Sequence, residues 1–326
     1  MLGGPVPDAT QWDQIEQVGD CSYKVFAYLE RLTAQGELIH QDDTSVRMLS
    51  LMAQNRQIQA AADAMGVSRP TERSGMFTTG LVVKVGEHTV GLYYSGRDHA
   101  GENRKALLRQ RRAGLATPLV MSDALSRNEA EENGLIRCHC LAHGRRQCSD
   151  LEDVFPRACQ VVLDVLKQVC DQDDKVRDQQ LCPEARLAYH QAVSGPSMDG
   201  LKQWLQKQVD DRLVEPNSSL GKAIVSMQRH WAPLTRFLQV PDAPLDNNFV
   251  ERALKLFIRQ RKNALFHRTE HSASIASVLT SLIGHLPLRR GQCLGVLGGV
   301  ARASPRGRGG PGGVAALDLC LKPGLA

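Results

Sequence analysis

Hydrophobic and β-branched residues gather in short runs over the first half of the chain, and these runs predict strands. Two neighbouring runs are separated by Gly86 and Glu87, so they predict a β-hairpin. An extended segment that carries acidic residues precedes this hairpin, and two short buried strands follow it. In chain order, the runs cover residues 37–44, 76–85, 89–94, 118–121 and 136–141.

Other stretches show the spacing of helices. Apolar residues over 10–36 fit two helical segments with a break near Gly19. A basic helix is expected over 102–112, and a short helix over 128–133. Residues 50–72 are polar with an Ala-rich centre, and we expect them to be irregular or weakly helical.

From residue 151 to residue 238 the pattern is that of amphipathic helices, punctuated by prolines. Strand-rich sequence followed by a helical block predicts an α/β core with a helical insertion. We divide the chain into five parts: a helical lead-in (1–36), the first part of the core (37–150), the insertion (151–240), the final core segment (241–284) and a Gly/Arg/Pro-rich tail (285–326).

The stretch from Pro244 to Phe266 carries the most informative helix. Asp246 or Asn247 can cap it, because a side-chain oxygen there accepts hydrogen bonds from the free amides of the first turn. One helical face then carries a carboxylate and three cations, at Glu251, Lys255, Arg259 and Lys262. Such a face suits a metal-bound phosphate at one end and a polyanion along the rest. A capped surface helix with a solvated basic face is the alternative for this stretch alone.

Charge is unevenly distributed along the chain. The net charge is only +5 over 326 residues, but residues 104–112 and 252–268 are strongly basic. Basic patches are what a nucleic-acid partner needs, because each neutralised phosphate releases counterions. A solvated surface remains the more common explanation of either patch taken by itself.

The composition of the chain indicates in which cellular compartment the protein is expected. The sequence contains no apolar run long enough for a bilayer and no signal-peptide pattern at its start, so we expect an intracellular protein. Nine irregularly spaced cysteines fit reduced thiols better than a disulfide framework. From residue 285 the sequence turns to Gly, Arg, Pro and Ala, and its low complexity predicts disorder.

Four motifs stand in order at wide spacing. They are Gln41-Asp-Asp-Thr44, Met121-Ser-Asp-Ala-Leu-Ser-Arg-Asn128, Cys140-Leu-Ala-His-Gly-Arg-Arg146, and Leu245-Asp-Asn-Asn-Phe-Val-Glu-Arg252 followed by Arg261-Lys-Asn-Ala-Leu-Phe266. With these motifs the chain, from about Pro5 to Ile283, resembles the insertion-sequence-66-type (IS66-type) transposases. The resemblance implies an α/β fold with an RNase H-like catalytic core, a mixed sheet with flanking helices, and a large α-helical insertion before the last acidic residue.

The same resemblance implies that the chain is altered at both ends. Family members carry metal-binding and helix-turn-helix segments before the first motif, so we expect a truncation at the N-terminus. They also continue after Ile283 into a helix with a Tyr-Leu ending, which this sequence lacks. Our hypothesis is a frameshift just after Ile283, which reading the neighbouring frame of the DNA would test.

By resemblance, Asp42, Asp123 and Glu251 are the catalytic and metal-binding Asp-Asp-Glu triad. Two-metal phosphodiester cleavage needs carboxylates that converge on two ions about 3.5–4 Å apart, and Mg²⁺ (or Mn²⁺) suits such hard oxygen ligands. Asp43 competes with Asp42, because the family shows Asp-Glu-Thr where this chain has Asp-Asp-Thr; we assign the metal to Asp42. Sequence spacing alone favours surface carboxylates.

Several further residues are candidates for DNA binding. They are His143, Arg145, Arg146, Arg252, Lys262 and Asn263. His143 and the two arginines beside it would form a cationic patch near the active site, and the alternative is a helix start with exposed arginines. Cys138, Cys140, His143 and Cys148 could instead bind Zn²⁺, but their spacing is irregular. Arg97 also matches a family position, without a chemistry that the sequence suggests.

The resemblance implies a DNA transposase, in which metal-dependent hydrolysis at the element ends precedes strand transfer of a 3′-hydroxyl into target DNA. Expected partners are DNA (element ends and target), further copies of the chain on that DNA and accessory proteins of the same element. No membrane contact is expected, and the expected location is the bacterial cytoplasm, associated with the nucleoid. The rival functions are a non-catalytic remnant with residual DNA binding and a metal-dependent nuclease.

Overall fold

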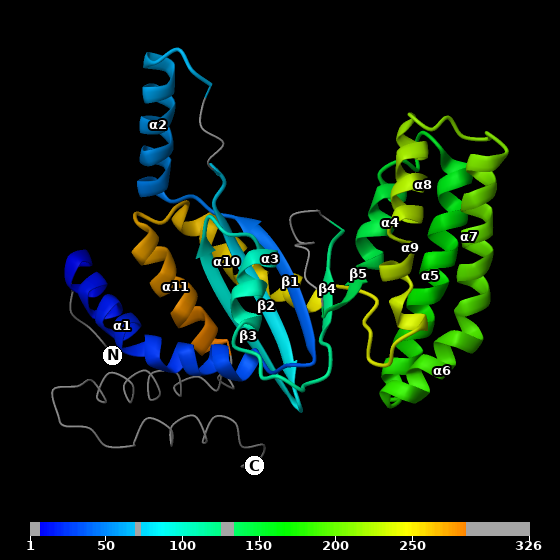
Figure 1. Cartoon of the computed structure of the whole chain (residues 1–326), viewed down its shortest axis with the longest axis horizontal. Helices are drawn as coiled ribbons and strands as arrows, with labels where there is room; N and C mark the ends of the chain where they lie inside the picture. Colours follow the sequence, from blue (N-terminus) through cyan, green and yellow to red (C-terminus); the bar gives the residue numbers. More distant parts are fainter. Residues whose placement is uncertain (1–6, 69–72, 125–133, 285–326) are drawn as a thin grey trace. The chain divides into compact units, whose positions relative to one another are not determined.

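The computed structural model describes residues 7–68, 73–124 and 134–284 (Figure 1). The helix expected over 128–133 and the tail from residue 285 lie outside the described residues. Within the described ranges, no helix combines the length and the apolar character that crossing a membrane requires.

Every predicted strand is present, and the five form one mixed sheet in the order β3-β2-β1-β4-β5. The strands are β1 (Leu38–Ser45), β2 (Phe77–Val85), β3 (His88–Gly96), β4 (Leu119–Ser122) and β5 (Ile136–His139). β2 and β3 pair antiparallel as the predicted hairpin, whose turn contains Gly86 at φ 57°, a backbone conformation that glycine tolerates. β4 pairs parallel with both β1 and β5. This sheet, with its flanking helices, confirms the predicted α/β core.

The chain divides into two compact units. Unit 1 contains the described residues of 1–37, 41–116 and 249–284, and unit 2 contains residues 38–40 and those of 117–248. Unit 1 therefore holds the hairpin and most of β1, while unit 2 holds β4, β5 and the helical block.

Unit 1 begins with one continuous helix, α1 (Asp8–Thr33), so the predicted break near Gly19 is wrong. Gly19 instead allows close packing between helices. A Cβ at Gly19 would lie 2.7 Å from Ile275 Cγ2 on α11 (Glu270–Ile283), so its absence lets the two helices approach closely. α11 packs against both α1 and β3, as Figure 1 shows. The basic helix expected over 102–112 is present as α3 (Ala100–Leu108) and ends earlier.

Residues 49–64 form a regular helix, α2 (Leu49–Ala64), which corrects the expectation of irregular or weakly helical structure. Its first turn is anchored, because Met48 and Leu51 are buried against Ala273 of α11. The Ala-rich centre favours helix by propensity, since alanine loses no side-chain entropy there. Beyond its base, α2 extends away from the sheet in Figure 1.

Unit 2 contains the predicted helical block. Its helices are α4 (Leu141–Ser149), α5 (Pro156–Asp178), α6 (Pro183–Val193), α7 (Gly195–Asp210), α8 (Ser219–Arg229) and α9 (Trp231–Leu234), followed by the 3-10 turn η2 (Arg236–Leu238). Pro156 and Pro183 stand in the first turn of their helices, where a missing N–H costs nothing. The first long helix therefore begins at Pro156, and Val154 before it is exposed. Apolar residues of α4, α5, α7 and α8 share one buried cluster.

Candidate functional site

The first two acidic residues occupy matching positions on neighbouring strands. β1 and β4 run parallel, and His40 lies opposite Met121. Asp42 stands two residues beyond His40, and Asp123 stands two residues beyond Met121, directly after β4 ends. Asp42 is half-buried and Asp123 is buried. Each aspartate thus stands two residues beyond the last position at which β1 and β4 pair.

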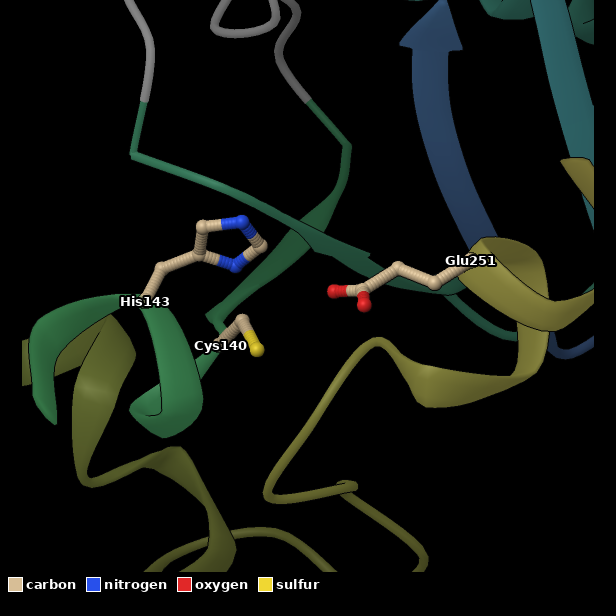
Figure 2. Close-up of side chains that lie close together, drawn as sticks. All are labelled: Cys140, His143 and Glu251. Atoms are coloured by element: carbon tan, nitrogen blue, oxygen red, sulfur yellow. The ribbon is translucent and has the colours of Figure 1, made fainter. Parts of the chain in front are cut away.

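The third acidic residue, Glu251, lies in the first turn of α10 (Asn248–Ala264), as Figure 2 shows. Asp246 caps this helix, because its Oδ1 accepts the backbone N–H of Asn248 at 3.0 Å, which confirms one of the two predicted caps. The other candidate, Asn247, is fully buried and its Oδ1 lies 3.1 Å from His40 Nδ1. The helix N-terminus stabilises an ionised carboxylate in its first turn through the backbone dipole.

Packing fixes the rotation of α10 about its own axis. Val250 and Leu254 pack over Gly80 of β2, where an added Cβ would lie only 3.0 Å from Leu254 Cδ2 and 3.1 Å from Val250 Cγ2. One turn later, the rings of Phe257 and Tyr93 lie 4.8 Å apart between their centroids. Glu251 directly follows the buried Val250, so the apolar contacts of the helix determine where its carboxylate projects.

Asp43, the alternative to Asp42 as the first metal ligand, is buried and hydrogen-bonded to other parts of the fold. Its side chain is 2% exposed. Oδ1 accepts the hydroxyl of Thr79 at 2.6 Å. Oδ2 accepts the backbone N–H of Ala100 at 3.0 Å and lies 3.2 Å from His99 Nδ1. The two adjacent aspartates therefore differ: Asp43 joins β1 to β2 and α3, whereas Asp42 accepts the Asp43 backbone N–H at 2.8 Å through one oxygen.

Two cations of the basic stretch 104–112 also serve the fold. Arg104 is 2% exposed and donates to Gln41 Oε1 at 2.9 Å. Arg111 donates to the backbone carbonyls of Gly36 at 2.7 Å and Ala116 at 2.7 Å. The burial of Arg104 could have been predicted from the sequence, because Arg104 stands one turn before the apolar Leu107 on the inward face of α3.

Arg97 has a structural role that the sequence did not suggest. Its guanidinium donates to Asn55 Oδ1 at 3.1 Å and to the backbone carbonyl of Arg73. These bonds hold α2 against the segment that leads into β2. Arg97 therefore orders a peripheral helix of unit 1.

The predicted cationic patch lies at the junction of β5 and α4. Figure 2 shows His143 on the first turn of α4, with Cys140 immediately before the helix. Arg145 and Arg146 are exposed, and His143 is partly buried. This junction is tied to the segment before α10 by two hydrogen bonds: Leu141 N–H to the Leu245 carbonyl at 2.9 Å and Asn247 N–H to Cys140 Sγ at 3.3 Å.

The cysteines near this junction behave as apolar packing groups. Cys138, Cys140 and Cys148 are buried in the main apolar cluster of unit 2. Burial raises the pKa of Cys138 to about 12 and that of Cys148 to about 11, so both are neutral thiols near neutral pH. Zinc is bound by the thiolate, so binding the metal here would require these thiols to lose their protons.

The remaining candidates lie on the outer face of α10. Arg252, Lys262 and Asn263 are exposed. Their neighbour Arg261 is different, because its Nη1 donates to the Ser45 carbonyl at 2.5 Å and to Ser45 Oγ at 2.8 Å. Unit 1 thus holds Asp42, Glu251, Arg252, Lys262 and Asn263, and unit 2 holds Asp123, His143, Arg145 and Arg146.

Comparison with known proteins agrees with these motifs. The family described as "Transposase IS66 family" matches residues 1–275. Two curated relatives come from Sinorhizobium fredii (strain NBRC 101917 / NGR234). "Uncharacterized protein y4jD" is 32% identical over 167 residues, which are 51% of this chain and 32% of that protein. "Uncharacterized protein y4hP" is 26% identical over 211 residues, or 59% of this chain and 37% of that protein. The chain thus spans about a third of the length of the curated relatives it matches.

Proposed function

Because the chain belongs to the IS66 transposase family, with an RNase H-like α/β core, we propose that it catalyses the DNA cleavage and strand transfer of transposition. The reaction is hydrolysis of a phosphodiester at the element ends, followed by attack of the freed 3′-hydroxyl on target DNA. In this proposal Asp42, Asp123 and Glu251 are the catalytic carboxylates, and divalent metal ions, Mg²⁺ or Mn²⁺, are the cofactors.

The observation that carries the proposal is the register of β1 and β4. His40 lies opposite Met121, and Asp42 and Asp123 each follow two residues after one member of this pair. The carboxyl ends of parallel strands meet at one edge of a sheet, which is where open α/β sheets bind their ligands. Carboxylates that converge on shared metal ions are what two-metal cleavage requires.

The environment of the two adjacent aspartates supports the choice of Asp42. Three donors already occupy both oxygens of Asp43. Asp42 uses Oδ1 for the Asp43 backbone N–H, a bond that orients its carboxylate. Asp43 therefore acts as a positioning residue for the strand that carries Asp42.

The donor set fits a hard divalent cation. All three groups are carboxylates, which supply the oxygen ligands that Mg²⁺ prefers. When bound, such ions lower the pKa of the attacking water and stabilise the leaving oxygen. The protein's part is geometric: the strands fix the two aspartates, and the packing of Val250 and Leu254 over Gly80 fixes the helix that carries Glu251.

Exposed cations supply the DNA contacts in this proposal. Arg252 and Lys262 lie on the solvent face of α10, and Arg145 and Arg146 lie on that of α4. Guanidinium and ammonium groups neutralise backbone phosphates without reading sequence. His143 and Asn263 add polar contacts, and the proposed assembly contains further copies of the chain on the DNA, with accessory proteins of the element.

Nicking of supercoiled DNA by the purified chain tests the proposal. We expect conversion to open circles that requires Mg²⁺ or Mn²⁺ and is lost in Glu251→Gln, which keeps the shape of the side chain but not its charge. Glu270→Gln serves as the matched control, because it makes the same chemical change at an exposed carboxylate of α11, outside the triad. Metal-dependent nicking that survives in Glu251→Gln would place the chemistry elsewhere, and a folded wild-type chain that never nicks would leave only a DNA-binding remnant.

A further inference from the structure

A shallow pocket opens within unit 1, between the end of β1 and the end of α10. It is open to solvent and too small to enclose a ligand, so a partner would lie across its mouth. Its lining combines hydroxyls, a guanidinium, an imidazole and apolar side chains, among them Thr44, Ser45, Arg261, Leu265, Phe266 and His267. Neither the acidic triad nor the predicted DNA contacts include any of these residues.

Arg261 is held in this pocket by one of its three nitrogens. Nη1 donates to Thr44 Oγ1 at 3.3 Å and to the Ser45 carbonyl and hydroxyl at 2.5 and 2.8 Å. Among the residues that the structure describes, Nη2 and Nε of Arg261 have no hydrogen-bond partner. The guanidinium is therefore oriented by the protein and still offers two N–H groups, which is the geometry that binds a phosphate through two oxygens.

The wall next to Arg261 is apolar and rigid. Leu265 takes a left-handed backbone conformation with φ 65°, which is costly for a residue with a Cβ. Phe266 follows it and remains 46% exposed. The chain is then fixed to the segment after β1, because His267 N–H donates to the Arg47 carbonyl at 2.8 Å and its carbonyl accepts Leu49 N–H at 2.9 Å. An aromatic ring is thus held at the mouth of the pocket with one part in water.

We propose that one unpaired nucleotide of the bound DNA lies across the mouth of this pocket, with its phosphate on Arg261 and its base against Phe266. The assignment rests on the proposed function, since it takes DNA as the ligand. A base stacks on an aromatic side chain whatever its identity, and a cation beside the ring holds the backbone. A free phosphate would use the guanidinium but would leave the exposed ring without a role.

The electrostatics of the helix end require these cations. The C-terminus of α10 carries partial negative charge, which opposes an anion. Arg261 lies in the last turn and offsets this charge, and the exposed Arg47 and Arg268 each directly follow a residue that lines the pocket. The pocket therefore depends on its side chains for anion binding, so a substitution of Arg261 should remove the phosphate contact.

Fluorescence anisotropy with two labelled duplexes tests the inference on the full chain. One duplex is blunt, and the other carries a short single-stranded extension. We expect wild type to bind the extended duplex more tightly, and Phe266→Leu, which keeps apolar bulk but removes the ring, to lose about tenfold of that affinity. Binding of the blunt duplex should not change. Leu256→Ala is the matched control, because Leu256 on α10 is as exposed as Phe266 and lies outside the pocket.

The outcomes separate this inference from the proposed function. Equal binding of the extended duplex by wild type and Phe266→Leu, with nicking intact, overturns the nucleotide assignment alone. A loss of affinity in Arg261→Gln without any loss in Phe266→Leu identifies a phosphate-only pocket and also overturns it. Failure of the wild-type chain to bind either duplex overturns both the nucleotide assignment and the proposed function.

Discussion

Asp43 of β1 accepts the backbone N–H of Ala100, the first residue of α3, at 3.0 Å. The bond satisfies one of the free amides of the helix start, and a carboxylate is favoured there by the helix dipole. The same side chain binds Thr79, so a single buried carboxylate connects a strand, its neighbour in the sheet and a helix. A residue that touches three elements contributes mainly to stability.

Replacing Asp43 should therefore destabilise the fold. Asp43→Ala leaves the Thr79 hydroxyl, the His99 ring and the Ala100 N–H without their acceptor, and each unsatisfied buried group costs about 1–3 kcal/mol. We expect the free energy of unfolding to fall by about 3 kcal/mol, as measured by urea denaturation followed by circular dichroism.

The adjacent substitution is its control. Asp42→Asn keeps the acceptor for the Asp43 N–H, so we expect stability close to wild type and loss of metal-dependent nicking. The two variants should thus separate stability from activity. An Asp42→Asn chain that nicks DNA normally would show that the first metal-binding carboxylate has been misassigned.

Gly80 should tolerate no large side chain. Its Cβ position lies 3.0 Å from Leu254 Cδ2, so Gly80→Val forces α10 away from β2. Overpacking of this kind costs about 1–3 kcal/mol, and it displaces the helix that carries Glu251. We expect a lower midpoint of urea unfolding and at least tenfold slower nicking.

Gly96→Ala provides the comparison, because no atom lies within 4 Å of its Cβ position. The same hairpin then carries an added methyl group with room around it, and we expect a change in stability of no more than about 0.5 kcal/mol. Equal stability of Gly80→Val and Gly96→Ala would show that α10 can shift without cost.

Acid should weaken unit 2 through Asp173 of α5. Burial alone would raise the pKa of Asp173, but the hydrogen bond from His190 and the charges of Arg186 and Arg177 outweigh burial and hold this pKa well below its usual value. A lowered pKa stabilises the folded state above the unfolded-state value of about 3.9, and this stabilisation is lost as the pH falls through the folded-state value. We expect the free energy of unfolding to decrease below about pH 4.

Urea denaturation at several pH values measures this dependence. Asp173→Asn should be less stable near neutral pH by about 1–3 kcal/mol, because it leaves the partly buried Arg186 and the buried His190 without their anionic acceptor. Its stability should also change less with pH below about pH 4. Parallel pH profiles for the two proteins would exclude Asp173 as the acid-sensitive group.

The buried thiols should resist alkylation. The pKa of Cys138 is raised to about 12 by burial, whereas Cys182 is exposed. Iodoacetamide at mildly alkaline pH should modify Cys182 in the native protein and Cys138 only after denaturation, as read by peptide mass spectrometry. A bound metal ion would protect its cysteine ligands from alkylation, and EDTA would remove that protection. Labelling of Cys138 that increases with EDTA would therefore support the zinc alternative.

The strands could be predicted from the sequence because their signals are local. Each strand is a short β-branched run bounded by turn residues, and the caps and prolines that begin the helices are read in the same way. Gly19 shows where local reading fails: a glycine inside a helical pattern predicts a break, but its purpose depends on Ile275, far along the chain. The helix α2 was missed for a similar reason, since α11 covers its first turn.

The resemblance assigned roles to the candidate residues and preferred Asp42 to Asp43 as the metal ligand. Asp42 and Asp43 are chemically identical and adjacent, so the local sequence gives no physical reason for that preference. Their difference comes from Thr79, His99 and Ala100, which only the folded chain brings to Asp43. Arg261 likewise stood among exposed basic residues of the same stretch, and its separate role depends on contact with the end of β1.

Glu251 and Arg261 lie ten residues apart on one uninterrupted helix. An α-helix rises 1.5 Å per residue, so α10 separates them by roughly 15 Å along its axis. If both proposals hold, the helix fixes the distance between the scissile bond and the bound unpaired nucleotide. That distance corresponds to about four nucleotide steps of a DNA strand. The length of α10, as well as its charges, then sets where along the strand the cut falls.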